Sequence, residues 1–277
     1  MRMYGLLGWP VKHSFSPAMH NAAFKALGIN AEYKLFPVAP DDIDTFLGSL
    51  DPQSVSGLNV TVPYKEKALA FVTLDQESLF LKQIKAINTI VNRDGRWLGF
   101  NTDIPGFSRH LLQQRNPAGK NVAILGAGGA CRAVAYVLAQ CRARQISIFD
   151  IDRQKADAIV EMIKDIFSGF PIHSAAHLEE LDIPHQDILI NATPVGLKET
   201  DPLLVEPLWL HRDMFVYDLI YNPAQTRLLR AASENGCQVS NGLGMLLYQG
   251  MLSFQIWTGA AAPEEVFRTA LESALRH

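Results

Sequence analysis

The chain has 277 residues, which at roughly 100–200 residues per domain predicts two domains. With 48% hydrophobic and 19% charged residues it has the composition of a globular protein, which excludes disordered, collagen-like and coiled-coil classes. The formal net charge of −3 does not indicate a nucleic-acid partner.

Short apolar strands alternate with helical patterns over the first hundred residues. The strands are expected at Met3–Leu7, Glu32–Pro37 and Gly57–Val62, followed by a hairpin of Ala86–Asn92 and Trp97–Phe100 around the turn Arg93-Asp94-Gly95. Helices are expected at Pro17–Leu27 with Ser16 as the N-cap, from Asp41, at Tyr64–Phe71 and at Asp75–Gln83. This alternation predicts a mostly parallel α/β sheet covered on both faces.

A second series of strands and helices follows. The strands are expected at Asn121–Leu125, Gln145–Phe149, Asp187–Ile190 and Phe215–Leu219, with helices to Ala139 and over Asp152–Phe167. Two further helices, Leu243–Trp257 and Pro263–Leu275, are expected to return to the first domain. We therefore expect a domain of residues 1–104 plus 245–277 and a Rossmann-type domain of residues 105–244.

The cysteines and the N-terminus limit where the protein is expected to act. The three cysteines, at positions 131, 141 and 237, form neither a disulfide framework nor a zinc pattern, so we expect a reducing cytoplasm and no metal. No signal-peptide pattern precedes the first strand, and no run of 18 uncharged apolar residues is present, so no membrane association is expected.

The clearest local motif is Gly126-Ala127-Gly128-Gly129-Ala130, between a strand and a helix. Free N–H groups and the dipole at a helix N-terminus favour an anion, and glycine allows a pyrophosphate to approach closely. A glycine-rich turn without a ligand is the weaker alternative. The motif predicts a dinucleotide cofactor.

Asp150, after the next strand, indicates which dinucleotide. A carboxylate there can accept a hydrogen bond from a ribose 2′-hydroxyl and would repel a 2′-phosphate, so NAD is favoured over NADP. Asp152 is interpreted as the N-cap of its helix, and Arg153 leaves open a contact with a phosphate.

Several polar residues of the first domain lie where packing alone would not require them. Ser14 and Ser16 stand at a helix start, where two hydroxyls and free helix amides can bind a carboxylate, although capping alone is an alternative for Ser16. Asn59 and Thr61 alternate in one strand and so share a face. Lys65 follows that strand at its carboxyl end, where open α/β sheets bind ligands.

Lys65 and Asp103 are a candidate acid–base pair. Reduction of a ketone needs a hydride donor and a proton donor, and a lysine beside a carboxylate can deliver a proton to a carbonyl oxygen. Sequence spacing does not show that the two side chains meet.

Eight motifs together resemble the shikimate dehydrogenase family along nearly the whole chain. They are Gly8–Pro17 with His20-Asn21, Asn59–Lys65, Ala86–Thr89, Gly99–Asp103, Gly126–Ala130, Asn191–Pro194, Asp218–Pro223 and Asn241–Met245. The resemblance implies two α/β domains with the active site in the cleft, and NADPH-dependent reduction of 3-dehydroshikimate to shikimate in aromatic amino-acid biosynthesis.

The resemblance also implies residue roles. Ser14 and Ser16 would hold the substrate carboxylate, Lys65 and Asp103 would be the catalytic pair, and Tyr221 would lie near the substrate. The ring hydroxyls and the reacting oxygen would be held by Asn59, Thr61, Lys65, Asn88, Asp103 and Gln249. The cofactor would be bound by Gly126, Ala127, Gly128, Gly129, Ala130, Asp150, Asn191, Thr193, Leu219 and Gly242.

Three positions depart from the family pattern. Asp150-Ile151-Asp152 replaces the usual Asn-Arg-Thr of NADP-dependent members, which again favours NAD. Lys85 replaces a glycine and Cys131 replaces a small alanine or serine.

Two other functions remain open. An NAD-dependent dehydrogenase of quinate and shikimate would keep the chemistry, although Ser16, where quinate-using members often have threonine, favours shikimate. A non-catalytic sensor of shikimate or nucleotide could dispense with Lys65 and Asp103, both of which are present. A monomer or a homodimer is expected.

Overall fold

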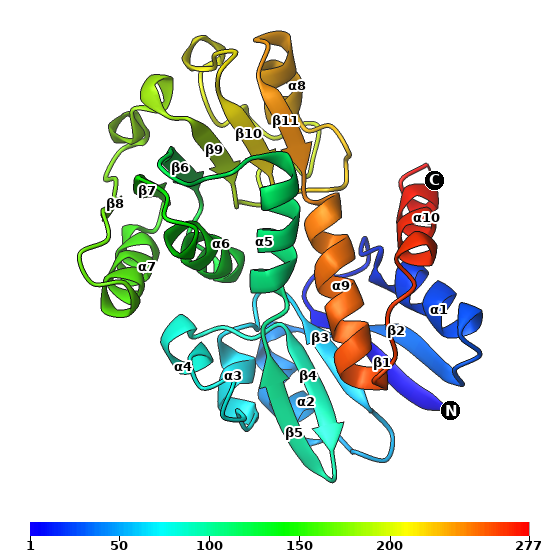
Figure 1. Cartoon of the computed structure of the whole chain (residues 1–277). Coiled ribbons are helices and arrows are strands. Elements are labelled where there is room, and N and C mark those ends of the chain that lie inside the picture. Colours follow the sequence, from blue (N-terminus) through cyan, green and yellow to red (C-terminus); the bar gives the residue numbers. More distant parts are fainter. Residues whose placement is uncertain (277) are drawn as a thin grey trace. The chain divides into compact units, whose positions relative to one another are not determined.

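The computed structural model describes residues 1–276 and divides into two compact units (Figure 1). The first unit is Met1–Gly106 with the C-terminal stretch from Leu247, and the second is Phe107–Leu246. The expected boundaries after residues 104 and 244 each differ from these by two residues. His277, the last residue of the expected first domain, lies outside the described residues.

The sheet of the first unit has the strand order β2-β1-β3-β4-β5. Its strands are β1 (Arg2–Gly8), β2 (Ala31–Pro37), β3 (Gly57–Val60), β4 (Thr89–Arg93) and β5 (Arg96–Phe100). β1 pairs in parallel with β2 and β3, whereas β3–β4 and β4–β5 are antiparallel. The sheet is therefore mixed rather than mostly parallel, because the Asp94-Gly95 turn, with φ of 52° and 78°, closes the expected hairpin at one edge.

Several helices of the first unit are shorter than the sequence predicts, although the first one has the expected length of 11 residues. They are α1 (Ser16–Ala26), the 3₁₀ turn η1 (Pro40–Asp42), α2 (Ile43–Gly48), α3 (Lys67–Phe71), α4 (Leu81–Ile84) and α10 (Glu264–Ala274). The expected helix at Asp75–Gln83 is mostly turn, where the Asp75 carboxylate accepts a hydrogen bond from the Ser78 amide at 2.9 Å. The N-cap of α1 is Phe15 and not Ser16, which is already the first helical residue.

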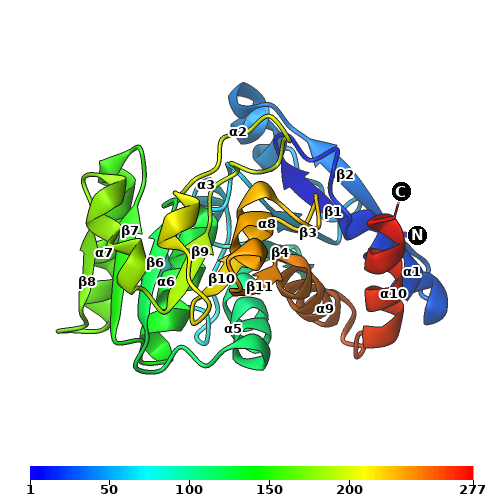
Figure 2. The ribbon, with the colours of Figure 1, turned by 90° about the horizontal axis from the view of Figure 1, so that it is seen from above.

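Aromatic side chains fill one face of this sheet. Tyr4 of β1 stacks between Phe24 of α1 and Trp257 of α9 (Leu243–Thr258), with ring centroids 5.4 and 5.0 Å away. α10 packs on α1, so the C-terminal helices return to this unit as expected (Figure 2). On the other face, Phe36 of β2 contacts Phe46 of α2 at 5.7 Å.

The sheet of the second unit is entirely parallel, in the order β11-β10-β9-β6-β7-β8. Its strands are β6 (Asn121–Leu125), β7 (Gln145–Phe149), β8 (Ile172–Ser174), β9 (Ile188–Asn191), β10 (Phe215–Asp218) and β11 (Gln238–Asn241). The strand order reverses between β6 and β9, the topology of a Rossmann fold. The short strands β8 and β11 were not predicted, because three or four residues carry too little apolar periodicity.

Helices cover both faces of this second sheet. They are α5 (Asp103–Gln114), α6 (Gly129–Gln140), α7 (Arg153–Ile166), α8 (Arg227–Glu234) and the 3₁₀ turns η2 (Leu178–Leu181), η3 (Ile183–His185) and η4 (Pro207–Trp209). Leu228 and Leu229 of α8 join one apolar cluster with Leu189 and Val216 of the strands. Alternate residues face the other way, where the ring of Tyr217 meets Phe107 of α5 at 5.4 Å.

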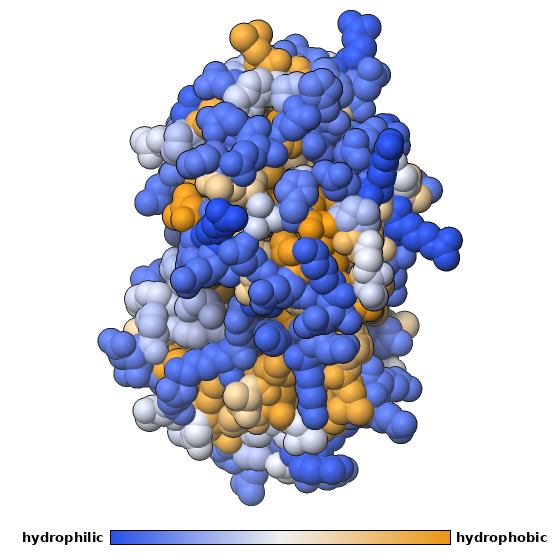
Figure 3. Space-filling view, turned by 90° about the vertical axis from the view of Figure 1, so that its left-hand side faces the viewer, coloured by the Kyte–Doolittle hydropathy of each residue, from blue (hydrophilic) through white to orange (hydrophobic). Residues whose placement is uncertain are grey.

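The surface shows no extended apolar band on the face seen in Figure 3, which is largely hydrophilic with separate apolar patches. Among the described residues, no helix is both long and apolar enough to cross a membrane. The three cysteines are free.

His20 of α1 is a fully buried histidine in the aromatic core. Its ring stacks on Tyr33 at 4.5 Å, and neither ring nitrogen has a hydrogen-bond partner within residues 1–276. Burial lowers its pKa to about 3. The unfolded chain therefore binds a proton below pH 6.5 that the folded chain binds only near pH 3, so acidification through this window favours unfolding.

We predict that His20→Phe makes stability less sensitive to acid. The difference in unfolding free energy between variant and wild type should grow in favour of the variant by roughly 4 kcal/mol as the pH falls from about 7 to 3. Denaturant titrations at a series of pH values measure it. His173→Gln, at an exposed histidine of β8, is the control and should change the pH profile much less than His20→Phe does. A constant difference between His20→Phe and wild type would contradict the prediction.

Candidate active site

Most of the candidate polar residues lie at one end of the strands of the first sheet, the carboxyl end of β1 and β3. β1 and β3 are parallel, so the segments after them, with Ser14, Ser16 and Lys65, leave the sheet at the same edge. β4 runs the other way, and Thr89 at its start pairs with Asn59 of β3 and with Phe100 at the end of β5. The segments holding Asn88 and Asp103 therefore begin at that edge as well.

Lys65 and Asp103, the predicted acid–base pair, are in contact. The ammonium Nζ of Lys65 donates to Oδ2 of Asp103 at 2.5 Å, and their side chains are only 10% and 7% exposed. Asp103 is the first residue of α5, where the helix dipole favours a carboxylate. The Lys65 carbonyl accepts from the Ile87 amide at 3.0 Å, which fixes the backbone of the turn. This pair is a buried ion pair with fixed geometry.

Asn88 holds Asp103 from the side opposite Lys65. Its Nδ2 donates to Oδ1 of Asp103 at 2.9 Å, and its Oδ1 accepts from the Thr102 amide at 2.7 Å. Gln249 of α9 lies next to it, with Oε1 3.4 Å from Nδ2 of Asn88. Asn88 and Gln249 are both buried. The carboxylate of Asp103 therefore has two fixed donors, Nζ of Lys65 and Nδ2 of Asn88.

Asn59 lies deeper than expected. Its Nδ2 donates to Oγ of Ser253 at 2.8 Å and to Oγ1 of Thr89 at 3.1 Å, and its Oδ1 accepts from the Tyr33 hydroxyl at 2.9 Å. With 4% of the residue exposed, its polar atoms are used inside the unit. Asn59 therefore supports the layer that holds Asn88, while its predicted contact with substrate stays a prediction.

Ser14 and Ser16 bring two hydroxyls together but not the free amides that the sequence suggested. The Ser14 hydroxyl donates to Oγ of Ser16 at 3.1 Å and accepts from the Ser16 amide at 3.2 Å. Pro17 has no N–H, and the Ala18 amide donates to the Phe15 carbonyl. Any anion at this turn would be bound by the hydroxyls.

The glycine-rich motif of the second unit opens α6 at the reversal of strand order. Gly126 has φ of 94°, and a Cβ there would come within 2.8 Å of Cγ2 of Thr193, so glycine is required. Gly128, the N-cap, is exposed, and nothing lies within 4 Å of where its Cβ would stand. The space above the first amides of α6 is therefore open to a pyrophosphate, which fits a dinucleotide.

Asp150 is fixed beside this motif. Its Oδ2 accepts from the Ala127 amide at 2.6 Å and its Oδ1 from the Asp152 amide at 2.8 Å. Asp152 is the N-cap of α7 as expected, but its side chain makes no capping bond and lies 3.4 Å from Nζ of Lys155. Arg153 is directed to Asp157 on its own helix, at 3.8 Å. Each Asp150 oxygen keeps a lone pair for a ribose hydroxyl.

The remaining candidates follow β9, β10 and β11. Asn191 ends β9, and its Oδ1 accepts from the amide and the hydroxyl of Thr193 at 3.0 and 2.7 Å. Leu219 and Tyr221 follow β10, and Gly242 follows β11. Gly242 touches the Leu219 backbone, because a Cβ there would stand 2.0 Å from the Leu219 carbonyl oxygen.

Comparison with known proteins shows the family of the chain. Residues 6–90 match the shikimate dehydrogenase substrate binding domain, and residues 242–272 match the shikimate 5′-dehydrogenase C-terminal domain. The NADP⁺-dependent shikimate dehydrogenase of Desulforamulus reducens is 42% identical and covers 96% of this chain and 93% of its own. The chain belongs to the shikimate dehydrogenase family.

Two solved members of related function have the same fold. A shikimate dehydrogenase in complex with NADP⁺ superposes with a TM-score of 0.89 at 36% identity, covering 99% of this chain and 96% of its own. The quinate dehydrogenase of Corynebacterium glutamicum in complex with NAD has a TM-score of 0.87 at 29% identity, covering 98% and 99%. The resemblance stated from the sequence motifs is therefore confirmed.

Sequence reasoning named the family's direct candidates but missed the supporting hydroxyls. Oγ of Ser253 lies 2.9 Å from Oγ1 of Thr89 and 3.1 Å from Oγ1 of Thr102. Ser253 is four residues after Gln249 on α9, so the two share a helix face, and this spacing was a usable signal. Thr89 and Thr102 were inside the family motifs but were not assigned a role.

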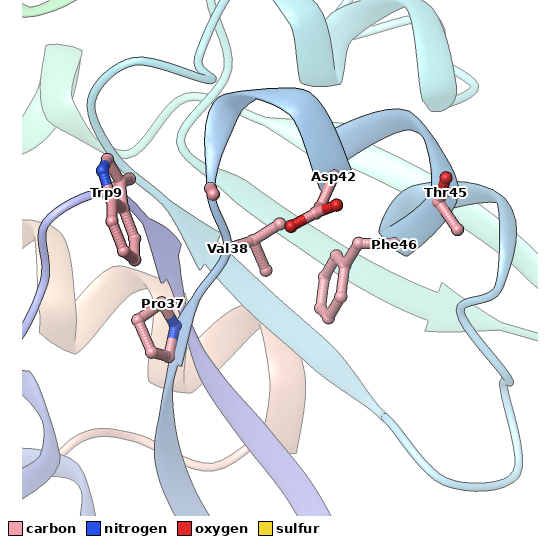
Figure 4. A pocket seen from close by; sticks show the side chains of 7 residues that line it. Trp9, Pro37, Val38, Asp42, Thr45 and Phe46 are labelled. Atoms are coloured by element: carbon pink, nitrogen blue, oxygen red, sulfur yellow. The ribbon is translucent and has the colours of Figure 1, made fainter.

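An open pocket of about 520 Å³ lies at the same end of the first unit (Figure 4). Its lining is mostly apolar and comes from the segments after β1 and β2 and from η1 and α2, including Trp9, Val38 and Phe46. Asp42 is its titratable residue, and neither Lys65 nor Asp103 lines it. The predicted acid–base pair therefore lies outside this pocket. The described residues contain no group of metal-ligating side chains.

We predict that Asn88→Ala destabilises the protein, because it strips one hydrogen bond from the buried Asp103 carboxylate and another from the Thr102 amide. The expected loss of unfolding free energy is about 2–4 kcal/mol, measured by denaturant titration. Asn92→Ala, four residues further along the chain in β4, is the matched control. Its Nδ2 has no partner within the described part of the chain and its Oδ1 accepts only a long bond of 3.3 Å from the Gly95 amide, so the variant should cost less than about 1 kcal/mol. Equal costs for the two variants would refute the supporting role of Asn88.

Proposed function

We propose that this chain catalyses the reversible, NAD(P)-dependent reduction of 3-dehydroshikimate to shikimate, a step of aromatic amino-acid biosynthesis. The observation that carries the proposal is the buried contact of Lys65 with Asp103, held by Asn88, in a member of the shikimate dehydrogenase family. A sensor would not need this pair, which favours an enzyme. The free cysteines fit a reducing compartment, so we place the activity in the cytosol.

The ion pair supplies the proton chemistry. The Lys65 ammonium has three N–H groups, of which one is directed to Asp103, so others can donate to the ketone oxygen of the substrate. In the direction of reduction, the oxygen gains a proton from Lys65 as hydride adds to the carbonyl carbon. Asp103 keeps the ammonium oriented, and the proton returns to Lys65 from solvent.

The hydroxyl-rich edge suits a polyhydroxy acid. We assign the substrate carboxylate to the adjacent hydroxyls of Ser14 and Ser16. Thr61, Asn88 and Gln249 then bind ring hydroxyls, since each carries a donor or acceptor at this edge. Asn59 contributes by holding the layer behind Asn88.

The second unit fits a dinucleotide whose bound nicotinamide ring exchanges hydride with the substrate carbon. The pyrophosphate would lie on the amides of Gly128, Gly129 and Ala130, and the adenosine ribose on Asp150. Thr193, Leu219 and Gly242 are assigned to the nicotinamide end. We propose that NAD is preferred, because Asp150 and Asp152 flank Ile151, whose side chain is 98% exposed and carries no charge for a 2′-phosphate.

A dehydrogenase that accepts quinate with NAD is the second candidate function. The carboxylates of Asp150 and Asp152 suit NAD, which is bound in the quinate dehydrogenase of similar fold and also in the shikimate 5-dehydrogenase of Listeria monocytogenes. Steady-state oxidation of shikimate and of quinate, each with NAD⁺ and NADP⁺, separates the two candidates. If the protein oxidises neither shikimate nor quinate, the proposed function is overturned.

We predict that Lys65→Ala lowers kcat by about two to four powers of ten with a modest change in KM, since general acid–base groups contribute on this scale. The control is Lys67→Ala, at an exposed neighbour whose Nζ lies 2.7 Å from Oδ2 of Asp44, and it should retain full activity. The double variant Lys65→Met, Asp103→Asn removes both buried charges and separates loss of chemistry from unfolding. Full kcat in a folded Lys65 variant would end the assignment.

We predict that the double variant Ile151→Arg, Asp152→Thr shifts the cofactor preference toward NADP⁺. A guanidinium gained and a carboxylate lost favour the 2′-phosphate, so the ratio of kcat/KM with NADP⁺ to that with NAD⁺ should rise at least about tenfold. The double variant Glu161→Gln, Asp165→Asn, at two exposed carboxylates of α7, changes the net charge by the same two units and is the control. An unchanged ratio would show that these positions do not choose the cofactor.

A further inference from the structure

Asp218 is a buried carboxylate that the proton chemistry above does not use. It is the last residue of β10, in register with Asn191 at the end of β9, and both are 0% exposed. Its position is the carboxyl edge of the parallel sheet, beside the segments that carry Thr193, Leu219 and Gly242.

Every acceptor bond of Asp218 goes to a different segment. Its Oδ1 accepts from Nδ2 of Asn191 and from the Ile220 amide, each at 3.0 Å, and its Oδ2 accepts from the Thr226 hydroxyl at 2.6 Å. Thr226 in turn caps α8 by accepting from the Leu229 amide at 3.3 Å. One carboxylate therefore ties together the loop after β9, the turn after β10 and the start of α8.

No ion pair within residues 1–276 involves Asp218, so its charge is balanced only by neutral donors. Burial raises its pKa to about 6. A buried carboxylate without a cation opposes folding, and an apolar residue of similar volume would often serve the sheet as well. Stability alone therefore does not explain a carboxylate at position 218.

The backbone that Asp218 fixes is the part assigned to the nicotinamide. The Leu219 amide donates to the Asn191 carbonyl at 2.9 Å, and the Gly242 amide donates to the Ile220 carbonyl at 3.1 Å. Gly242 lies directly against the Leu219 carbonyl. The carboxamide of a nicotinamide needs fixed acceptors for its N–H groups, and the backbone carbonyls of this segment can provide them. Hydride transfer is sensitive to small errors in the position of the nicotinamide ring.

We propose that Asp218 is the positioning residue of the nicotinamide end of the cofactor site: its carboxylate locks the 219–220 backbone and the Asn191 side chain so that the ring binds in one orientation. This inference rests on the proposed function, because it needs a nicotinamide dinucleotide as the ligand. Asp218 acts through its neighbours and touches no reacting atom.

The test compares how tightly the protein binds a whole dinucleotide and a fragment of it. Calorimetry measures the dissociation constants of NAD⁺ and of ADP-ribose, which lacks the nicotinamide, for wild type and Asp218→Ala. The variant should bind NAD⁺ at least about tenfold more weakly and ADP-ribose within about twofold of wild type, and its KM for NAD⁺ should rise. A merely structural role would weaken both ligands alike.

Two further variants keep the test decisive. Asp218→Asn should retain most of the NAD⁺ affinity, because its amide oxygen still accepts from Ile220 and Asn191 and the Thr226 hydroxyl can reverse to accept. If Asp218→Ala does not fold, Thr226→Val removes one bond to the carboxylate and should weaken NAD⁺ selectively by a smaller factor. Asp187→Asn, at a carboxylate before β9 that accepts from the Asn121 amide at 2.9 Å, is the control and should change neither constant.

The outcomes separate the two proposals. If wild type binds NAD⁺ and Asp218→Ala (or Thr226→Val, where Asp218→Ala does not fold) loses affinity for NAD⁺ and ADP-ribose equally, or for neither, the positioning role is overturned and the proposed function stands. If wild type shows no binding of NAD⁺ or NADP⁺ and no shikimate oxidation, the proposed function fails first.

Discussion

The buried ion pair of Lys65 and Asp103 sets the main constraint on the first unit. Two charges with side chains 10% and 7% exposed lose much of their hydration, and their attraction offsets that loss only if the remaining lone pairs and protons are satisfied. Asn88 meets this need for Asp103, and the Thr102 amide fixes Asn88 in turn. The hydroxyl layer of Thr89, Thr102 and Ser253 exists because each polar group placed near the pair needs a partner of its own.

The same logic applies in the second unit without a cation. Asp218 is the last residue of β10 and Asp150 directly follows β7, and backbone amides donate to one or both carboxylate oxygens of each. Asp150 is partly exposed and keeps lone pairs directed outward, whereas Asp218 is fully buried and binds inward. The difference in burial thus makes Asp150 suited to binding a ligand and Asp218 suited to holding loops. The sequence alone does not distinguish them, because each lies at the end of an apolar strand pattern.

Much of this could be predicted because it rests on local patterns. The continuous apolar run Asn121–Leu125, followed by glycines and a helix, predicted β6 and α6 with the correct strand bounds. Lys65 and Asp103 were named from chemistry and family motifs. By contrast, the helix expected at Asp75–Gln83 is mostly turn, because side-chain bonds to the backbone competed with the helical pattern there.

The sequence could not predict how deeply a polar side chain is buried. The alternation of Asn59 with Thr61 left open whether Asn59 meets a polar network or a ligand, and the family resemblance implied a ligand. Its side chain bonds to residues of three other elements: Tyr33 of β2, Thr89 of β4 and Ser253 of α9. These partners are 26, 30 and 194 residues away along the chain, so no local pattern reports them. The strand period fixes the face on which Asn59 lies, but only tertiary packing decides whether that face meets a ligand or the return of the C-terminal helix.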